Sequence, residues 1–132
     1  MAVIDPMRLI LDTVTFIWAV SAPERLSRSA ISALRKATAV REISVVSLTE
    51  IVVKQTRGKL TFGKADALAG VADLRLRVLP YAAEHAFRLF DLPTHHADPF
   101  DRQIIAQALV ENVPVVTPDE SFNFYEGLKV VW

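Results

Sequence analysis

Four short segments of this chain carry acidic residues at points where a strand should be followed by a helix. The segments are Leu9-Ile10-Leu11-Asp12-Thr13, Ser47-Leu48-Thr49-Glu50-Ile51, Asp98-Pro99-Phe100-Asp101-Arg102 and Val116-Thr117-Pro118-Asp119-Glu120. In a parallel α/β sheet the strand ends converge on one edge, so carboxylates that are far apart in the sequence can meet there. Clustered carboxylates bind hard cations, and Mg²⁺ or Mn²⁺ held in this way can cut phosphodiesters.

Two of these carboxylates also have simple structural explanations. Asp12 directly follows an apolar strand, where it could do no more than cap the next helix. Glu50 completes the sequence Ser47-Leu-Thr-Glu50, which matches a capping box, and it could pair with Lys54 one turn later. For Glu50 taken alone the capping box is the better explanation, whereas Asp12 taken alone does not decide between a cap and a site.

Asp98 and Asp101 belong to one helix start, at the N-cap and at the third helical position. Because the helix dipole stabilises negative charge there, one of the two needs no other explanation. We expect Asp98 mainly to cap the helix and Asp101 mainly to bind metal. Arg102 beside them could balance their charge or contact a phosphate.

The last acidic segment contributes Asp119, which follows a strand. Its neighbour Glu120 is the less suitable ligand, because adjacent helical positions point in different directions. Thr117 could do no more than cap a short helix after the strand. The segment therefore offers one expected ligand, with Thr117 as a secondary candidate.

Two further groups of residues could take part in such a site. His95 and His96 are neighbours, and because adjacent histidines seldom bind one ion, a surface loop pair is favoured. A local basic run surrounds Gly58 and consists of Lys54, Arg57, Lys59 and Lys64. This run is either a solvated helix end or a surface that grips an RNA backbone.

Strands and helices alternate along the sequence. Apolar and β-branched runs predict strands at 8–11, 43–46, 77–80, 113–116 and 128–131. Helices are predicted at 13–20, 28–39, 47–57, 64–74, 82–90 and 99–111, with N-caps at Ser27, Ser47 and Asp98 and with Gly58 at a helix end. This alternation predicts a three-layer α/β/α sandwich with a mostly parallel central sheet, in a single domain of residues 1–132.

The composition limits the classes of protein to consider. A chain of 132 residues fits one domain, 52% of it is hydrophobic, and it has no cysteine, which suits a reducing cytoplasm. The formal net charge is zero, so attraction to nucleic acid must come from local patches. We expect neither a transmembrane helix nor a signal peptide. The sequence has no P-loop, no G-x-G-x-x-G and no G-x-S-x-G motif.

From residue 9 to residue 132 the chain resembles the PIN-domain ribonucleases, and in particular the VapC-type toxins of bacterial toxin–antitoxin pairs. The resemblance rests on four segments in the family's order and spacing, at 9–19, 47–60, 92–108 and 116–122. The most specific stretch is His95-His96-Ala97-Asp98-Pro99-Phe100-Asp101-Arg102. Counting back from Ile105-Ala106-Gln107-Ala108 favours Asp101 over Asp98 as the family's ligand.

The resemblance implies a PIN-like fold, hydrolysis of RNA to 5′-phosphate and 3′-hydroxyl ends, and a set of functional residues. The residues that would hold one or two Mg²⁺ or Mn²⁺ ions are Asp12, Glu50, Asp101 and Asp119. The secondary site candidates are Asp98, Thr117 and Arg102, and the candidates for RNA contact are Lys54, Arg57 and Lys59. Family members are usually cytoplasmic homodimers that a small VapB-type antitoxin holds inactive, and no membrane is implied.

Two other classes of function remain open. A receiver-like phosphoacceptor domain would share the length, the α/β alternation and an acidic Mg²⁺ pocket, but it needs an acidic pair near the first strand, where Asp12 stands alone. A PIN-like fold could also act only as a regulatory or binding module, although the presence of all four acidic residues argues against lost catalysis. Cleavage of RNA would separate the nuclease from both alternatives.

Overall fold

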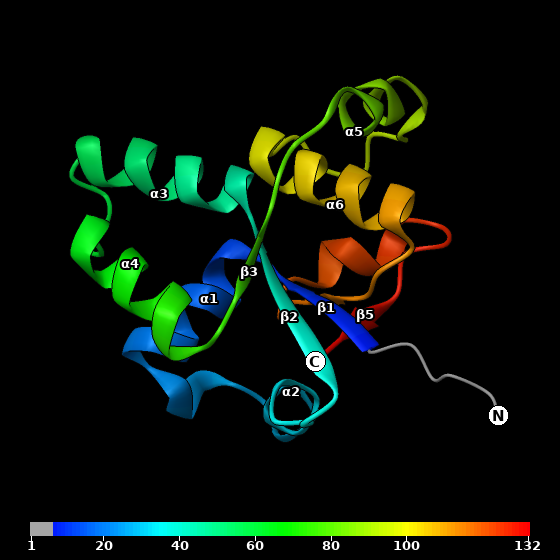
Figure 1. The fold of residues 1–132 in the computed structure, drawn as a ribbon. Coiled ribbons are helices and arrows are strands. Elements are labelled where there is room, and N and C mark those ends of the chain that lie inside the picture. The colour runs from blue at the N-terminus through cyan, green and yellow to red at the C-terminus, as the bar shows by residue number, and fades with distance from the viewer. Residues whose placement is uncertain (1–6) are drawn as a thin grey trace, which may run out of the picture.

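The computed structural model describes residues 7–132, which form five strands and their covering helices (Figure 1). The strands are β1 (Met7–Leu11), β2 (Ala39–Ser44), β3 (Arg77–Leu79), β4 (Val115–Val116) and β5 (Val130–Val131). They lie in the order β3-β2-β1-β4-β5, and every pairing is parallel. The predicted parallel sheet is therefore confirmed. The start of the chain, where we expect no signal peptide, lies outside the described residues.

Helices cover both faces of this sheet and complete the three predicted layers. They are α1 (Thr13–Ser21), α2 (Arg28–Leu34), α3 (Val45–Thr56), α4 (Lys64–Asp73), α5 (Ala83–Arg88) and α6 (Pro99–Glu111), with short 3₁₀ turns at η1 (Pro23–Arg25), η2 (Leu89–Asp91) and η3 (Glu120–Phe124). Consecutive strand residues point to opposite faces. Accordingly, Ile10 packs with residues of α6, whereas Leu9 and Leu11 pack with residues of α2 and α1.

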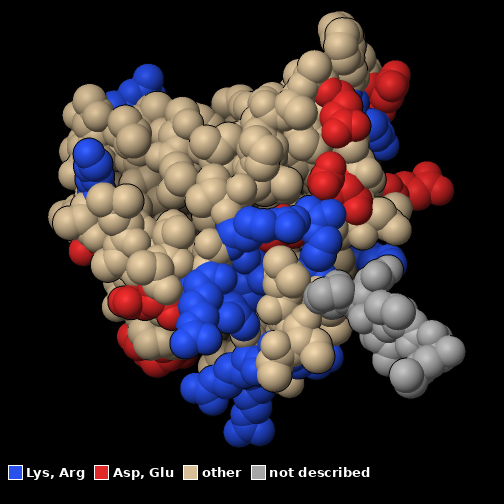
Figure 2. Space-filling model, viewed as in Figure 1, with Lys and Arg blue, Asp and Glu red and all other residues tan. Residues whose placement is uncertain are grey.

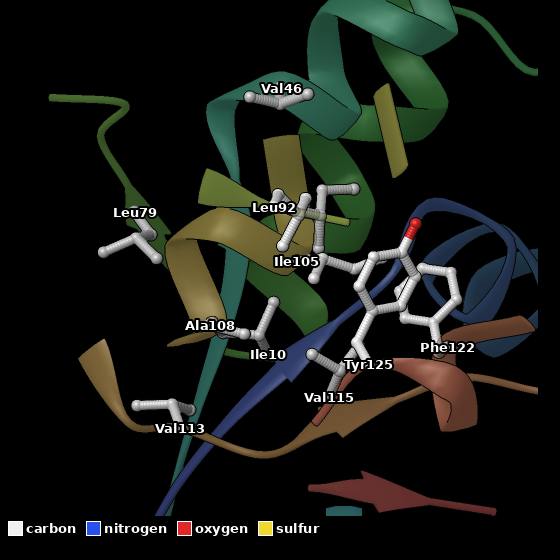
Figure 3. Close-up of a cluster of buried hydrophobic side chains, with 11 residues drawn as sticks. Ile10, Val46, Leu79, Leu92, Ile105, Ala108, Val113, Val115, Phe122 and Tyr125 are labelled. Atoms are coloured by element: carbon white, nitrogen blue, oxygen red, sulfur yellow. The ribbon is translucent and has the colours of Figure 1, made fainter. Parts of the chain in front are cut away.

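The largest hydrophobic cluster lies between the sheet and α6 (Figure 3). There Ile105 and Ala108 of α6 face Ile10 of β1, while Phe122 and Tyr125 close the cluster from the C-terminal segment. All of these side chains are buried. The cluster thereby fixes α6 and η3 against the central strands, and the acidic segments at the starts of these elements are positioned with them.

The junction of β2 and α3 differs from the prediction. The strand is Ala39–Ser44, not 43–46, and α3 begins at Val45 with Ser44 as its N-cap, where the Ser44 side chain accepts from the backbone N–H of Val46 at 3.0 Å. The β-branched pair Val45-Val46 indicated strand, but Ser44 stops the strand and starts the helix. Ser47 is therefore not an N-cap, and the predicted capping box with Glu50 does not exist.

Several other predicted boundaries are wrong. Helix α2 ends at Leu34, not at 39, because the chain turns into β2, and Arg41 donates to the free Leu34 carbonyl at 3.0 Å. Thr117 caps no helix; the turn η3 starts later, with Asp119 as its N-cap. The last two strands are also shorter than predicted.

Several predicted helix ends are confirmed. The side chain of Ser27 accepts from the N–H of Ala30 at the start of α2, and the side chain of Asp98 caps α6. Gly58 follows α3 with a φ of +69°, the left-handed conformation that glycine adopts without a Cβ penalty. Within residues 7–132 no helix is both long and apolar enough to cross a membrane.

Charge is unevenly distributed although the net charge is zero. Figure 2 shows Lys and Arg side chains gathered over the strands and α2 on the viewed face. Beneath them the fully buried Glu42 of β2 accepts from Arg8 at 2.7 Å and from Arg77 at 2.6 Å. These pairs cross β1, β2 and β3 and hold the three strands together by charge-assisted hydrogen bonds.

Candidate metal centre

Asp12 is the first residue after β1 and combines a structural role with a position in the acidic pocket. One carboxylate oxygen accepts from the backbone N–H of Thr15 at 2.9 Å, which caps α1, and the other accepts from the hydroxyl of Thr117 at 2.5 Å. Burial raises the pKa of Asp12 to about 6, although both hydrogen bonds oppose this rise. The cap and the site are therefore the same carboxylate.

Glu50 lies in the middle of α3, almost fully buried, and caps nothing. One of its oxygens lies 2.6 Å from the hydroxyl of Thr13, which also lies 2.9 Å from the hydroxyl of Ser47. The other oxygen pairs with the ammonium of Lys54 at 2.5 Å, as the sequence spacing indicated. Thr13 and Lys54 thus fix the Glu50 carboxylate between α1 and α3.

The two carboxylates at the start of α6 play different roles. Asp98 accepts from the N–H groups of Phe100 and Asp101, both at 2.9 Å, so it caps the helix as predicted. The pKa of Asp101 rises to about 8, first because of burial and then because of the negative charges of other acidic residues, among them Asp98 and Glu50. Asp101 is therefore the carboxylate that gains most from a nearby cation.

Asp119 caps η3, because one of its oxygens accepts from the N–H of Ser121 at 2.9 Å. Its own N–H donates to the hydroxyl of Thr117 at 3.0 Å, and that hydroxyl in turn donates to Asp12. Thr117 is buried directly after β4 and links the Asp12 carboxylate to the backbone of Asp119. It therefore orients acidic residues from both ends of the chain.

A single pocket of about 380 Å³ brings the four acidic segments together. The acidic residues that line it are Asp12, Glu50, Asp98, Asp101 and Asp119. Its other lining residues include Lys54 and Lys59, which lie near the Gly58 turn. The four distant segments thus meet in one pocket, as expected, but only Asp12 and Asp119 come shortly after a strand. Glu50 lies within α3, and Asp98 and Asp101 follow a loop at the start of α6.

Two of the cationic candidates lie outside this pocket lining. Arg57 is exposed at the C-terminal end of α3. Arg102 donates to the carbonyls of Pro93 and Leu92 at 2.9 and 3.2 Å, so two of its nitrogen atoms hold the loop that leads into α6. Lys54 and Lys59 are therefore the two cationic candidates that line the acidic pocket.

His96 is the residue whose position the sequence argument missed. The sequence favoured a surface position for both histidines. His95 is exposed, but the side chain of His96 is only 17% exposed. Its Nε2 lies 3.5 Å from the Asp101 carboxylate, and this nitrogen, an Asp101 oxygen and an Asp119 oxygen all lie within 4.8 Å of one another. The only available signal was its position two residues before the predicted cap Asp98.

The donors in this pocket fit a hard divalent cation. Carboxylate oxygens are the preferred ligands of Mg²⁺ and of Mn²⁺, and the pocket gathers five carboxylates. The pKa of Asp101, raised to about 8, indicates that these groups repel one another when all are ionised. A cation would remove this repulsion.

The sequence from residue 9 to residue 127 matches the model of the PIN domain family, and the chain therefore belongs to this family. Among the curated proteins no sequence matches the chain. The strand order β3-β2-β1-β4-β5 also differs from the 2-1-3-4-5 order of receiver domains, so the receiver-like alternative is no longer supported.

Solved structures of VapBC proteins share this fold. VapBC2 from Rickettsia felis, bound to a promoter DNA fragment, is 20% identical with a TM-score of 0.70 and covers 94% of this chain and 97% of its own. DNA-bound VapBC from Salmonella typhimurium is 20% identical, with a TM-score of 0.65 and coverages of 94% and 96%. VapBC-5 from Mycobacterium tuberculosis is 21% identical, with a TM-score of 0.64 and coverages of 95% and 98%.

Proposed function

We propose that this protein is a metal-dependent endoribonuclease and the toxin of a VapBC-type toxin–antitoxin pair. PIN domains are generally nucleases. The observation that carries the proposal is the pocket in which carboxylates from four distant segments meet. The similarity in fold to VapBC structures supports the toxin part of the proposal.

In this proposal Asp12, Glu50, Asp101 and Asp119 hold one or two Mg²⁺ or Mn²⁺ ions. A bound ion would stabilise the negative charge on the phosphate, and it would lower the pKa of a water molecule that serves as the nucleophile. The protein's part is to fix the ligands before substrate arrives: Thr117 orients Asp12, and Thr13 orients Glu50. Lys54 pairs with Glu50 at 2.5 Å and also lines the pocket, where the proposal places the phosphate.

The proposed substrate is single-stranded or looped RNA, which is cut to 5′-phosphate and 3′-hydroxyl ends. Lys59 lines the acidic pocket, and the exposed Arg57 lies two residues before it. Cations at the edge of an acidic metal site can contact the phosphates on either side of the scissile bond. Lys59 and Arg57 therefore remain our candidates for contact with the RNA backbone.

The proposed partners are a VapB-type antitoxin and a second copy of the chain. A second pocket, of about 430 Å³, is lined largely by apolar side chains of α1, α2 and the segments before α2 and after α4. The charged residues that line it are Arg35, Arg41, Asp73 and Arg75, three cations against one acid. An antitoxin segment with apolar and acidic residues would fit this surface. For the dimer, Phe87 and Phe90 are 68% and 85% exposed and stack with their centroids 6.2 Å apart, and burial of such a pair would favour association.

The proposal is tested by incubating purified, antitoxin-free protein with total cellular RNA in Mg²⁺ or Mn²⁺, with EDTA as a control for metal dependence. Asp12→Asn should abolish cleavage while the protein stays folded. Glu120→Gln is the matched control, because Glu120 is exposed, adjacent to Asp119 and absent from the pocket lining. A folded protein that cuts none of several RNA classes would contradict the proposal and favour a PIN-like binding module.

A further inference from the structure

We infer that His96 supplies a nitrogen ligand to the ion held by Asp101 and Asp119, and that this ligand makes the site favour transition-metal ions over Mg²⁺. The inference rests on the metal site of the proposed function and goes beyond it, because it concerns a residue outside the acidic set. It also predicts which class of ion the site selects.

The first observation is that the Nε2 atom of His96 has no hydrogen-bond partner although it is buried. A buried polar atom without a partner costs free energy, so its retention needs a reason. The nearest charged group is the Asp101 carboxylate, 3.5 Å away, without the geometry of a hydrogen bond. An ion between the two groups would use both the nitrogen lone pair and the carboxylate.

The second observation is that the ring of His96 is held in place from its other side. Its Nδ1 lies 2.7 Å from the hydroxyl of Tyr125, whose side chain is buried. The ring also packs against Phe122, with centroids 6.0 Å apart, and edge-on against Tyr125, with centroids 5.6 Å apart. If Nδ1–H donates to the tyrosine oxygen, the Nε2 lone pair is free, which is the arrangement usual for a ligating histidine.

The third observation is the spacing of the donor atoms. The His96 nitrogen, one Asp101 oxygen and one Asp119 oxygen all lie within 4.8 Å of one another. Ligands at about 2.0 to 2.2 Å from one ion lie about 3 to 4.4 Å apart, depending on the angle between them. Small side-chain adjustments therefore suffice for all three to share an ion.

A second histidine shows why His96 is distinctive among the described residues. Glu84, His85 and Glu111 have a similar donor spacing. However, Nδ1 of His85 accepts from the backbone N–H of Ala82 at 2.9 Å, so Nε2 carries the proton of the neutral ring and donates it to Glu111 at 3.1 Å. His85 has no free lone pair for an ion, whereas His96 can have one.

The chemical consequence concerns ion selectivity. Mg²⁺ is bound through oxygen ligands and retained water, whereas an imidazole nitrogen is a good ligand for first-row transition ions. A site with two carboxylates and one imidazole should therefore discriminate against Mg²⁺ more than a site made of carboxylates alone. In a cell this would decide which ion supports the activity.

The test is pulsed electron paramagnetic resonance of the full-length protein loaded with one equivalent of Mn²⁺. We expect ¹⁴N modulation in the wild-type protein, its loss in His96→Gln, and its retention in His95→Gln, the matched control. In parallel, His96→Gln should weaken Mn²⁺ binding by about tenfold or more, as measured by titration, while Mg²⁺ binding, measured by competition, changes much less.

Labelling all histidines with ¹⁵N in the wild-type protein gives a test that needs no folded variant, because the modulation should change from the ¹⁴N to the ¹⁵N pattern. One result would overturn the inference and leave the proposed nuclease intact. In that result the wild-type protein binds Mn²⁺, Asp101→Asn no longer binds it, and the bound Mn²⁺ shows no nitrogen modulation. A wild-type protein that binds no Mn²⁺ while it cuts RNA without added metal would overturn both the inference and the metal part of the proposed function.

Discussion

Asp101→Asn should raise the free energy of unfolding of the metal-free protein, although it removes a functional residue. The pKa of Asp101 rises from 3.8 to about 8 in the folded protein, because of burial and then because of the charges of neighbouring carboxylates. The folded state therefore binds this proton more tightly than the unfolded chain does. It follows that the stability of the metal-free wild-type protein falls as the pH rises from about 4 to about 8.

The magnitude follows from the same pKa. Each pKa unit corresponds to about 1.36 kcal/mol, so at pH 7 the cost of keeping this carboxyl in the folded pocket approaches about 4 kcal/mol. The side chain is 19% exposed, and contact with solvent lowers that cost. We therefore expect Asp101→Asn to stabilise the metal-free protein by about 2–4 kcal/mol at pH 7, and by very little at pH 4.

The assay is urea denaturation in EDTA at pH 4, 7 and 8.5, with Glu120→Gln as the control for loss of an exposed acid. Mn²⁺ at about a thousand times its dissociation constant should cancel or reverse this order of stability, because it adds about 4.1 kcal/mol to the protein that binds it. If Asp101→Asn is no more stable than the wild-type protein in EDTA at pH 8.5, then burial and the neighbouring negative charges do not make the ionised Asp101 costly, and the argument for a cation fails.

Three further substitutions test the remaining parts of the site and the fold. Asp98→Asn should keep the helix cap and most of the cleavage activity, whereas Asp98→Ala should lower the free energy of unfolding by about 1 kcal/mol, because it removes the cap. A stable Asp98→Asn variant that loses most of its RNA cleavage would show instead that Asp98 is a metal ligand. Thr117→Val removes a hydrogen bond that lowers the pKa of Asp12, so the pKa of Asp12 should rise in the variant. The pH at which the cleavage rate increases should therefore move to a higher value, and an unchanged pH–rate profile would contradict a role of Thr117 in keeping Asp12 acidic. Glu42→Gln removes the carboxylate that Arg8 and Arg77 share, although Arg8 keeps Glu111 at 3.2 Å. Because both cations are partly exposed, the loss in urea denaturation should be about 2–3 kcal/mol, below the roughly 3–5 kcal/mol of a fully buried pair, and no measurable loss would contradict a role of Glu42 in holding the strands together.

The sequence was sufficient to predict the fold class and the convergence of the acidic segments, because both follow from simple patterns. The buried run Leu9-Ile10-Leu11 has no polar alternation, which is typical of a strand covered on both faces, and helices do cover both. Once the strands are parallel, residues that follow them must share an edge. That geometry accounts for Asp12 and Asp119, whereas α3 brings Glu50 and α6 brings Asp101 to the same edge.

The sequence was not sufficient where two local signals competed. Ser44 and Ser47 are both good N-caps, and the capping box formed by Ser47 and Glu50 favoured the second. In the structure β2 pairs with β1 as far as Ile43 and with β3 as far as Ser44, so the N-cap of α3 lies three residues earlier than predicted. Glu50 thereby moves from the first turn to the buried middle of α3. The choice depends on strand pairing between distant segments, which a local pattern does not contain.

His96 was missed for a related reason. Its environment is built by Phe122 and Tyr125, which lie far along the chain and reach it only because they pack into the cluster between the sheet and α6. A pair of adjacent histidines in a polar loop carries no sign of this packing. The structure leaves His95 exposed, with its ring beside Phe124 and Tyr125, and places His96 against the carboxylates, a distinction that arises from tertiary contacts.

In the sequence, capping and metal binding are alternative explanations for an acidic residue at a helix start. The structure indicates that the two roles support each other. Asp12, Asp98 and Asp119 each cap a helix or a 3₁₀ turn in the same pocket. Backbone N–H groups at these helix starts stabilise the carboxylates and fix their orientation, which lets several negative charges stay close together. Asp101 caps nothing, and its pKa is the one raised to about 8. The caps therefore preorganise most of the pocket, while the uncapped carboxylate leaves it short of positive charge, and that shortage is what a bound cation would supply.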